Sequence, residues 1–314
     1  MNILITGGCG YVGSVLIEKL LKKNLKLTVI DTQWFGNYLQ QNKNLVNIRD
    51  DIRNIDSNLL KGFEVVIHLA NIANDPSVDL NPTLSWEVNV LAMQQLADNS
   101  ARAGVKQFIY ASSGSVYGIK DEPNVTEDLS LVPISVYNKT KMVAERVLLS
   151  YGNQMAVHCI RPATVCGWSP RMRLDVSVNM LTMQALQNKK ITIFGGSQTR
   201  PNIHILDLVS VYEHFINNPK IQNGCYNAGF ENISILDIAN TINSILPSEI
   251  VITDSNDPRS YRQDSTKLLN TGYVQKYSVR DAIQEIITKF NDGELKDNPN
   301  FYTVKRMKEL NLHK

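Results

Sequence analysis

The sequence predicts an α/β protein with a doubly wound parallel sheet and a second, smaller and discontinuous α/β region. Two observations carry this prediction. Short apolar runs alternate with longer amphipathic segments in the first half of the chain, and a glycine cluster directly follows the first apolar run. Strands that alternate with helices form parallel βαβ units. Because the alternation becomes irregular near residue 165, we expect one domain over residues 1–165, joined by segments near 200–225, and a second domain mainly over 166–314.

The individual elements follow from the spacing of apolar residues. Runs bounded by polar or turn residues predict buried strands at Asn2–Thr6, Leu27–Ile30, Val65–Leu69, Gln107–Ala111 and Lys190–Phe194. Apolar residues at helical spacing predict helices at Val12–Lys23, Leu84–Ala103, Tyr137–Tyr151, Val176–Gln187, Ile235–Leu246 and Val279–Asn291. The charged tail, Lys296–Lys314, is expected to be a solvated terminal helix.

The composition argues against several classes of protein. The 314 residues include 32 Lys and Arg against 30 Asp and Glu, a formal charge of +2 that gives no reason to expect binding to nucleic acid or to an anionic membrane. Four scattered cysteines without C-x-x-C spacing suggest neither a metal site nor a disulfide framework. No segment approaches ~18 uninterrupted apolar residues. We therefore expect a cytoplasmic protein that is neither membrane-bound nor processed.

The glycine cluster lies between the first predicted strand and the first predicted helix. Gly8, Gly10 and Gly13 fit the spacing G-x-G-x-x-G, and Gly7, Gly10 and Gly13 fit G-x-x-G-x-x-G. Glycines allow a tight turn and a close approach of the backbone to a pyrophosphate, which then lies on the free amides of the helix N-terminus. The segment therefore predicts a dinucleotide site.

Asp31 ends the second predicted strand, 18 residues after Gly13. A carboxylate at this point can accept hydrogen bonds from the hydroxyls of an adenine ribose, and it repels a 2′-phosphate. No Arg or Lys follows within Thr32–Asn42 to reverse that preference. The residues favour NAD over NADP, and the alternative is a structural glycine turn with an unrelated Asp.

Tyr137 and Lys141 are four residues apart on a predicted helix, so both side chains project from one face. A phenol with a pKa near ~10 is a poor base, but an adjacent ammonium and a positive nicotinamide ring both favour the phenolate. Tyr137 could then accept a proton from a substrate hydroxyl as hydride leaves the same carbon. Such a pair also occurs by chance. Ser113 strengthens the case, because it follows a strand where parallel sheets place functional loops and can bond the reacting oxygen.

Eight motifs follow one another along the chain in a characteristic order. They are Gly7-x-x-Gly10-x-x-Gly13, Asp31, Asp51-Ile52, His68-Leu69-Ala70, Asn89, Ser112-Ser113-x-x-Val116-Tyr117-Gly118, Tyr137-x-x-x-Lys141 and Arg161-Pro162. With them the chain resembles the extended short-chain dehydrogenase/reductase family of NAD-dependent nucleotide-sugar epimerases and dehydratases, which includes UDP-glucose 4-epimerases. The resemblance runs from residue 1 to about 285 and implies a Rossmann-type fold.

The resemblance implies roles for individual residues. Tyr137 would be the catalytic base, Lys141 would bind the nicotinamide ribose and keep Tyr137 ionised, and Ser113 would bridge the substrate hydroxyl. Asn89 would order the sheet behind the site, and His68 is expected to be a polar packing residue. The residues expected at the cofactor are Gly7, Gly10, Tyr11, Val12, Gly13, Asp31, Asp51, Ile52, Leu69, Ala70, Asn89, Tyr137, Lys141 and Pro162.

The second half resembles the part of the family that binds the substrate, a nucleotide-diphosphate sugar. Arg200 is the candidate for the substrate pyrophosphate, and Arg259 is a second candidate, ahead of Arg262, because the planar guanidinium can bind two phosphate oxygens. Asn179 is expected to contact the nucleotide. For each arginine a surface salt bridge is the alternative role.

Departures from the family pattern bear on the chemistry. Family dehydratases and decarboxylases carry acidic residues directly after the reactive Ser or Thr, whereas this chain has Gly114 and Ser115. We therefore predict a 4-epimerase that oxidises C4 to a 4-keto sugar and returns the hydride. A 4-keto-sugar reductase, a C4 oxidase or dehydratase, and a non-catalytic nucleotide-binding protein remain alternatives. Thr164 and Cys166 also depart from related enzymes, so the sugar stays open. By resemblance we expect a homodimer formed through the helices Leu84–Ala103 and Tyr137–Tyr151.

Overall fold

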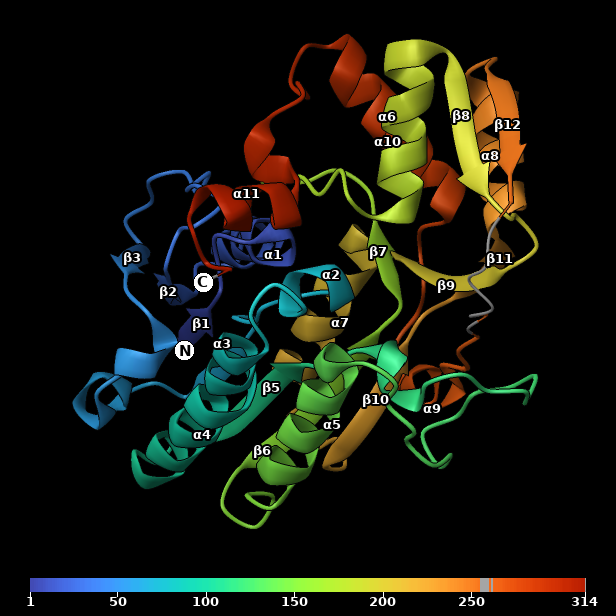
Figure 1. Ribbon diagram of the computed structural model, residues 1–314. Coiled ribbons are helices and arrows are strands. Elements are labelled where there is room, and N and C mark those ends of the chain that lie inside the picture. The colour runs from blue at the N-terminus through green and yellow to red at the C-terminus, as the bar shows by residue number, and fades with distance from the viewer. Residues whose placement is uncertain (255–259, 261, 314) are drawn as a thin grey trace.

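A seven-stranded parallel sheet forms the centre of the molecule (Figure 1). The computed structural model describes residues 1–254, 260 and 262–313. The strands lie in the order β10-β6-β5-β4-β1-β2-β3, and every neighbouring pair is parallel. The strands are β1 Asn2–Thr6, β2 Lys26–Asp31, β3 Leu45–Arg49, β4 Val65–His68, β5 Gln107–Ala111, β6 Ala156–Pro162 and β10 Gly224–Ala228. The order reverses between β1 and β4, which confirms the predicted doubly wound, Rossmann-type fold.

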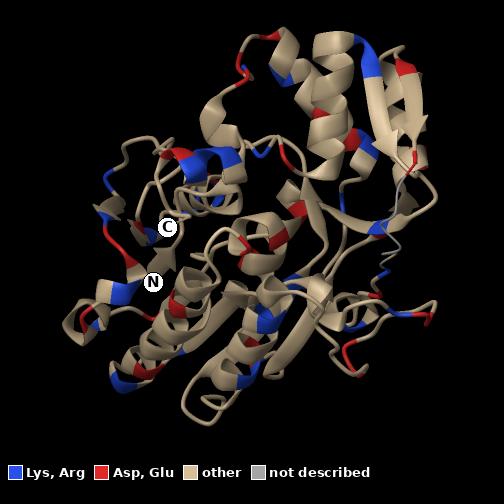
Figure 2. Cartoon of the chain, in the orientation of Figure 1, with Lys and Arg blue, Asp and Glu red and all other residues tan. Residues whose placement is uncertain are grey.

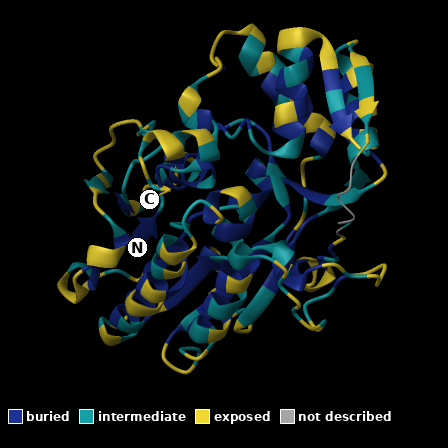
Figure 3. Ribbon diagram, in the orientation of Figure 1, coloured by how far each residue is buried: buried dark blue, intermediate teal, exposed yellow. Residues whose placement is uncertain are grey.

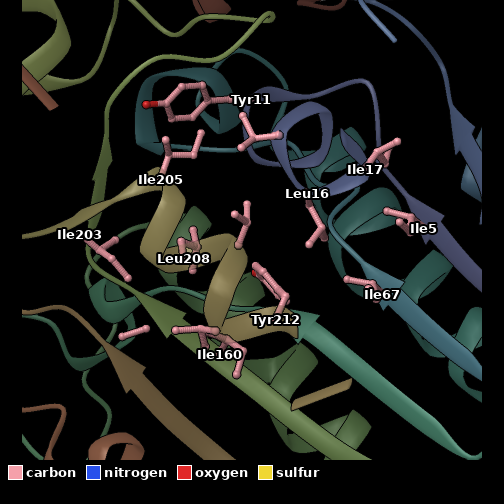
Figure 4. Close-up of a cluster of buried hydrophobic side chains, with 14 of the residues drawn as sticks. Ile5, Tyr11, Leu16, Ile17, Ile67, Ile160, Ile203, Ile205, Leu208 and Tyr212 are labelled. Carbon is pink, nitrogen blue, oxygen red and sulfur yellow. The ribbon is translucent and has the colours of Figure 1, made fainter. Parts of the chain in front are cut away.

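Helices cover both faces of this sheet. They are α1 Tyr11–Leu21 and α7 Ile205–Asn217 on one face, and α4 Met93–Arg102 and α5 Val136–Leu149 on the other. Ile3 and Ile5 of β1 pack with α1 and α7, in the cluster drawn in Figure 4, whereas Leu4 packs with α4 and α5. Because both faces are covered, β4 is buried along its whole length and β1, β5 and β6 are buried along most of theirs (Figure 3). These inner strands are accordingly rich in apolar residues.

The long helix predicted from residue 84 to 103 is formed by three consecutive helical segments. They are α3 Pro82–Trp86, the π-helical η3 Glu87–Ala92, and α4. A π-helical turn is often found near a functional site.

The smaller region is built from two short sheets and three helices (Figure 1). Its strands are β7 Thr164–Cys166, β9 Thr199–His204 and β11 Glu231–Ser234 in one sheet, and β8 Lys190–Phe194 and β12 Glu249–Thr253 in the other. Its helices are α6 Ser177–Asn188, α8 Ile235–Ile245 and α10 Val279–Asn291, which share a buried apolar cluster. Between these elements the chain returns to the large sheet with α7 and β10.

The remaining elements are short. They are η1 Ile52–Asn54, η2 Ser57–Leu60, α2 Asp75–Val78, η4 Gly114–Tyr117, α9 Thr266–Leu269, η5 Pro299–Phe301 and α11 Thr303–Glu309. The prediction of a solvated tail is wrong for α11, because Met307 is only 1% exposed and Phe301 is also buried. Basic and acidic residues are interspersed over the outer faces (Figure 2). Within the described ranges, no helix is both long enough and apolar enough to cross a membrane.

Candidate active site

The turn from β1 into α1 is packed so closely that a Cβ does not fit at Gly7 in the loop or at Gly13 in the first turn of the helix. Gly7 has φ +73°, and a Cβ there would lie 2.4 Å from the backbone nitrogen of Ala70. A Cβ on Gly13 would lie 2.6 Å from the Cα and the carbonyl oxygen of Gly8. No described side chain caps α1 at Gly10. The loop therefore leaves the amides at this helix end free for an anion, which is the cradle that a pyrophosphate needs.

A cavity of about 480 Å³ begins at this loop and extends along the carboxyl ends of the central strands. Open α/β sheets bind their ligands at this edge, where the strand order reverses, and the volume is that of a small-molecule site. The predicted residues that line it are Gly7, Gly10, Tyr11, Val12, Gly13, Asp31, Asp51, Ile52, Leu69, Ala70, Ser113, Tyr137 and Pro162. The structure therefore brings most of the predicted residues to one cavity.

Asp31 is fixed at the end of β2 by two backbone amides. Its carboxylate accepts hydrogen bonds from the Cys9 nitrogen at 3.0 Å and from the Gln33 nitrogen at 2.7 Å. Burial raises the pKa of Asp31, while these two bonds and the charge of Arg171 lower it. The bonds orient the carboxylate in the cavity wall, where a ribose hydroxyl would meet it.

Arg171 is a cavity residue that the sequence analysis did not single out. Its side chain is 3% exposed, its guanidinium lies 4.3 Å from the centre of the Phe35 ring, and its Nε has no hydrogen-bond partner within the described chain. Burial lowers its pKa to about 10, so it stays positive at neutral pH. A buried cation with an unused donor in this wall suits an anionic or polar ligand group.

Tyr137 and Ser113 meet at the opposite end of the cavity from Asp31. Tyr137 is the second residue of α5, which begins at the cap Ser135. Burial raises the pKa of Tyr137 to about 12, while a hydrogen bond with Ser113 and the positive charge of Arg173 act in the opposite direction. Burial dominates, so the phenol is protonated at neutral pH in this state of the protein.

Lys141 lies one helical turn behind Tyr137 and does not line the cavity. Its Nζ donates to the carbonyl oxygen of Ala111 at 2.6 Å and lies 5.8 Å from the centre of the Tyr137 ring. Burial lowers the pKa of Lys141 to about 7, and the charge of Glu145 raises it. The ammonium expected to hold Tyr137 ionised is thus weakened by its own burial. The assignment of Lys141 to a nicotinamide ribose remains a prediction.

Two predicted contact residues lie behind the cavity wall. Asn89, expected at the cofactor, accepts from the backbone nitrogen of Ile72 at 2.8 Å and donates to its carbonyl oxygen at 3.1 Å. Asn179, expected at the substrate nucleotide, donates to the hydroxyl of Tyr11 at 3.0 Å and to the carbonyl oxygen of Arg173 at 2.9 Å. Neither side chain lines the cavity. In this structure both brace cavity residues, Ile72 in the first case and Tyr11 and Arg173 in the second.

Arg200, the first candidate for the substrate pyrophosphate, is not brought to this cavity. Arg200 lies on β9, where its Nη1 donates to the carbonyl oxygen of Thr199 at 3.0 Å, and it does not line the cavity. Arg259 lies outside the described residues. Arg173 and Asp175 line the cavity instead, and they form an ion pair with an Nε to Oδ1 distance of 2.8 Å. Their segment has no regular pattern, so only the structure reveals their position.

Comparison with known proteins decides the family. Residues 3–229 match the model of the NAD dependent epimerase/dehydratase family. The chain belongs to this family. It is 31% identical over 260 residues to the uncharacterized UDP-glucose epimerase YtcB of Bacillus subtilis. This alignment covers 78% of this chain and 82% of that protein.

Two further relatives carry different names. UDP-glucuronic acid decarboxylase 1 of Danio rerio is 27% identical over 337 residues, covering 100% of this chain and 78% of that protein. The crystal structure of UDP-glucuronic acid 4-epimerase from Bacillus cereus, in complex with UDP-glucuronic acid and NAD, superposes with a TM-score of 0.81 at 30% identity. That match covers 93% of this chain and 99% of the other.

The protein is therefore an NAD-dependent epimerase/dehydratase, and its residues fit the cofactor. The positions of Gly7 and Gly13 leave no room for a Cβ beside the free end of α1, as a bound pyrophosphate requires. Asp31 lies in the wall at the end of β2. The cavity continues from there to Ser113 and Tyr137, so a dinucleotide would span it from adenosine to nicotinamide.

Proposed function

We propose that this enzyme is a nucleotide-sugar 4-epimerase that works with retained NAD. One observation carries the proposal. Tyr137 and Ser113 share a hydrogen bond at the cavity wall, whereas the next residues offer no carboxylate. The Ser115 hydroxyl occupies that place and donates to the side-chain oxygen of Asn138 at 2.7 Å. Proton abstraction from a sugar carbon or loss of CO₂ would need an added acid or base here, whereas epimerisation at C4 does not.

The carboxylates of the cavity support the same reading. Within the described chain, the carboxylates that line it are those of Asp31, Asp50, Asp51 and Asp175. The first three lie with β2, η1 and their connecting loops, far along the wall from Tyr137, and Asp175 is paired with Arg173. None of them is a free acid beside the reactive hydroxyls. Asp75, whose negative charge helps to raise the pKa of Tyr137, does not line the cavity and accepts a hydrogen bond from Oγ of Ser135 at 2.5 Å.

Each residue at the reactive end of the cavity has its own role in the reaction. Tyr137 acts as its phenolate, which the positive ring of bound NAD would favour after the phenol has lost its proton to solvent. The phenolate oxygen takes the proton of the C4 hydroxyl and later returns it, while the Ser113 hydroxyl holds the same sugar oxygen. The positive charge of Arg173 favours the phenolate as it forms. NAD, held by the glycine loop and Asp31, would supply a reversible hydride acceptor for C4, and return of the hydride to the other face of the sugar would give the epimer. Apolar walls such as Leu69, Val88 and Leu208 exclude water meanwhile.

The same hydroxyls would serve a 4-keto-sugar reductase or an oxidase that releases its keto product. The relatives named as a UDP-glucose epimerase and a UDP-glucuronic acid 4-epimerase favour epimerisation. The relative named as a decarboxylase shows that loss of CO₂ also occurs in the family. Cofactor use separates them. An epimerase needs no added cofactor, whereas a reductase consumes reduced cofactor in proportion to product. A non-catalytic nucleotide-binding protein would convert none of the sugars.

The direct test is incubation with a panel of nucleotide-diphosphate sugars in D₂O, followed by NMR. We expect one sugar to give its C4 epimer without solvent deuterium and without added cofactor. Deuterium at C3 or C5, or loss of CO₂, would overturn the proposal. Tyr137→Phe should lower kcat by at least about 100-fold, the scale of one acid–base group, while Tyr151→Phe, in the turn just beyond the far end of α5, should not.

We also propose that two chains associate through the helices α4 and α5. These helices contact one another along one side of the sheet, and Leu91 in the adjoining π-helical turn is 61% exposed. An apolar side chain at that position suits a helix–helix interface. Light scattering at micromolar concentration should give the mass of a dimer, and Leu91→Lys should shift it toward the monomer. A monomeric wild-type protein would contradict this.

A further inference from the structure

We propose that the C-terminal strap, which we define as residues 297–313, forms the outer wall of the adenosine end of the NAD site and slows the release of NAD. The inference assigns Thr303 and Met307 to the cofactor site. It rests on the use of NAD and not on which sugar is converted, so it can fail or succeed independently of the 4-epimerase proposal.

Two residues of α11 line the cavity itself. Thr303 and Met307 lie one helical turn apart, so both face the same way. Met307 is 1% exposed and belongs to the hydrophobic cluster that Ile52 also joins, with Trp34 and Phe35 packed against it. These three neighbours line the cavity too. The strap therefore completes an apolar wall whose other members come from the segments after β2 and β3.

Hydrogen bonds attach the strap to both sides of the cavity. On one side, Nε of Arg306 donates to the carbonyl oxygen of Trp34 at 2.9 Å. On the other, the Thr303 nitrogen donates to Oδ2 of Asp175 at 3.0 Å, and the Leu174 nitrogen donates to the carbonyl oxygen of Phe301 at 3.0 Å. Since Asp175 also pairs with Arg173, the strap is linked to the wall that continues toward Tyr137.

The position of α11 explains how it would retain a ligand. The helix α11 contacts α2, and the two helices lie near one another in Figure 1. It thus spans from the segment after β2, which Arg306 contacts, to α2, and it lines the same cavity as the glycine loop that would hold the pyrophosphate. A dinucleotide leaving by this edge must first displace Met307 from its buried position. The strap also lies beyond residues 3–229, so the family match does not assign it to the cofactor.

An enzyme that reuses one NAD through many turnovers gains from such a wall. The reduced cofactor must stay in place until the hydride returns to the sugar, and each escape leaves an inactive enzyme. The structure places the added closure at the adenosine end, away from the sugar. Substrate can therefore exchange at the other end while the strap stays closed.

The test measures NAD retention directly. Met307→Ala shortens the side chain in the wall, and Arg306→Ala removes the bond to the Trp34 carbonyl. Met180→Ala on α6, which is 36% exposed and does not line the cavity, is the matched control. Each purified protein is assayed for bound nucleotide after denaturation. The release of bound NAD is then followed by exchange with its fluorescent ethenoadenine analogue, and circular dichroism checks the fold.

We expect Met307→Ala and Arg306→Ala to release NAD about tenfold faster or more, the change that 1.4 kcal/mol produces, and to be purified with less nucleotide. Met180→Ala should match the wild type. A chain truncated after Lys296 should lose NAD fastest, and if it does not fold, the two point variants decide the question. Release rates equal to the wild type in both folded point variants would overturn the proposal.

Discussion

Glu145 and Arg161 form an ion pair in the interior, directly behind the reactive loop. Arg161 donates from Nε and from Nη2 to the two carboxylate oxygens, each at 2.8 Å, and both side chains are nearly inaccessible to water. Ser112, the neighbour of the reactive Ser113, donates to the same carboxylate at 2.5 Å. The pair therefore fixes the loop after β5 to α5 and β6, and so fixes the distance between Ser113 and Tyr137.

Removing one member of this pair should be costly. Glu145→Ala leaves a buried guanidinium without its carboxylate, and such losses amount to about 3–5 kcal/mol. Urea unfolding should report this decrease in the free energy of unfolding. Glu18→Ala breaks an exposed pair with Lys22 of the same length, 2.8 Å, and should cost less than about 1 kcal/mol. Equal effects of the two substitutions would contradict the structural role of the buried pair.

A substitution at Gly7 tests whether the close packing of the glycine loop is needed to bind NAD. Gly7→Ala places a Cβ 2.4 Å from the backbone of Ala70, so the loop must shift and NAD binding should weaken by at least about tenfold, or 1.4 kcal/mol. Gly62→Ala is the matched control, since Gly62 also has a positive φ, +86°, but nothing lies within 4 Å of its Cβ position. Calorimetric titration of the apoprotein with NAD measures both. A Gly7→Ala variant that binds NAD as well as Gly62→Ala does would argue against the cradle.

Asp31 should set the choice between NAD and NADP. Asp31→Asn removes the negative charge that would repel a 2′-phosphate, while the positive charge of Arg171, which lowers the pKa of Asp31, remains in the same wall. We expect the ratio of the Kd values for NADP and NAD to fall by about tenfold or more. Asp98→Asn on the surface of α4 should leave the ratio unchanged. An unaltered ratio of Kd values in Asp31→Asn would show that another residue distinguishes NAD from NADP.

The burial of His68 leads us to expect that the stability of the protein depends on pH. It is fully buried, its Nδ1 lies 2.6 Å from the Thr6 hydroxyl, and its ring stacks on Tyr110, as expected of a polar packing residue. Burial, and then the charge of Lys141, lower its pKa to about 3. Between that value and the unfolded pKa near ~6.5 the unfolded state binds the additional proton, so stability falls as the pH falls.

The expected loss from this group between pH 7 and pH 5 is about 2 kcal/mol. Urea unfolding at the two pH values should show a smaller loss for His68→Asn than for the wild type, and the same loss as the wild type for His313→Asn, whose side chain is exposed. If His68→Asn loses as much stability as the wild type, His68 does not carry this part of the pH dependence.

Much of the fold could be predicted because its signals are local. The strands Gln107–Ala111 and Lys190–Phe194 were predicted with their observed bounds, since each is an apolar run that ends at turn residues. The helix Val279–Asn291 was also predicted with its observed bounds, and it begins at a capping box of Ser278 and Asp281. β3 was missed because it is an edge strand in which the polar residues Asn47 and Arg49 interrupt the apolar run.

The site was predictable where backbone geometry demands a residue type, as at Gly7 and Gly13. It was not predictable where a side chain acquires its role from distant contacts. Arg171 lies in an irregular segment, and its position becomes clear only from its stacking on Phe35. Met307 lies in a charged tail that predicts a solvated helix, and only the packing against the segment after β2 reveals that it is buried.

The most direct measurement uses the substrate found in the panel, prepared with deuterium at C4, and enzyme without added cofactor. If hydride passes from C4 to retained NAD and returns, the epimeric product keeps its deuterium at C4 in ordinary water, and mass spectrometry finds no free reduced cofactor. Loss of the label to solvent, or its recovery in released NADH beside a 4-keto sugar, would contradict the account.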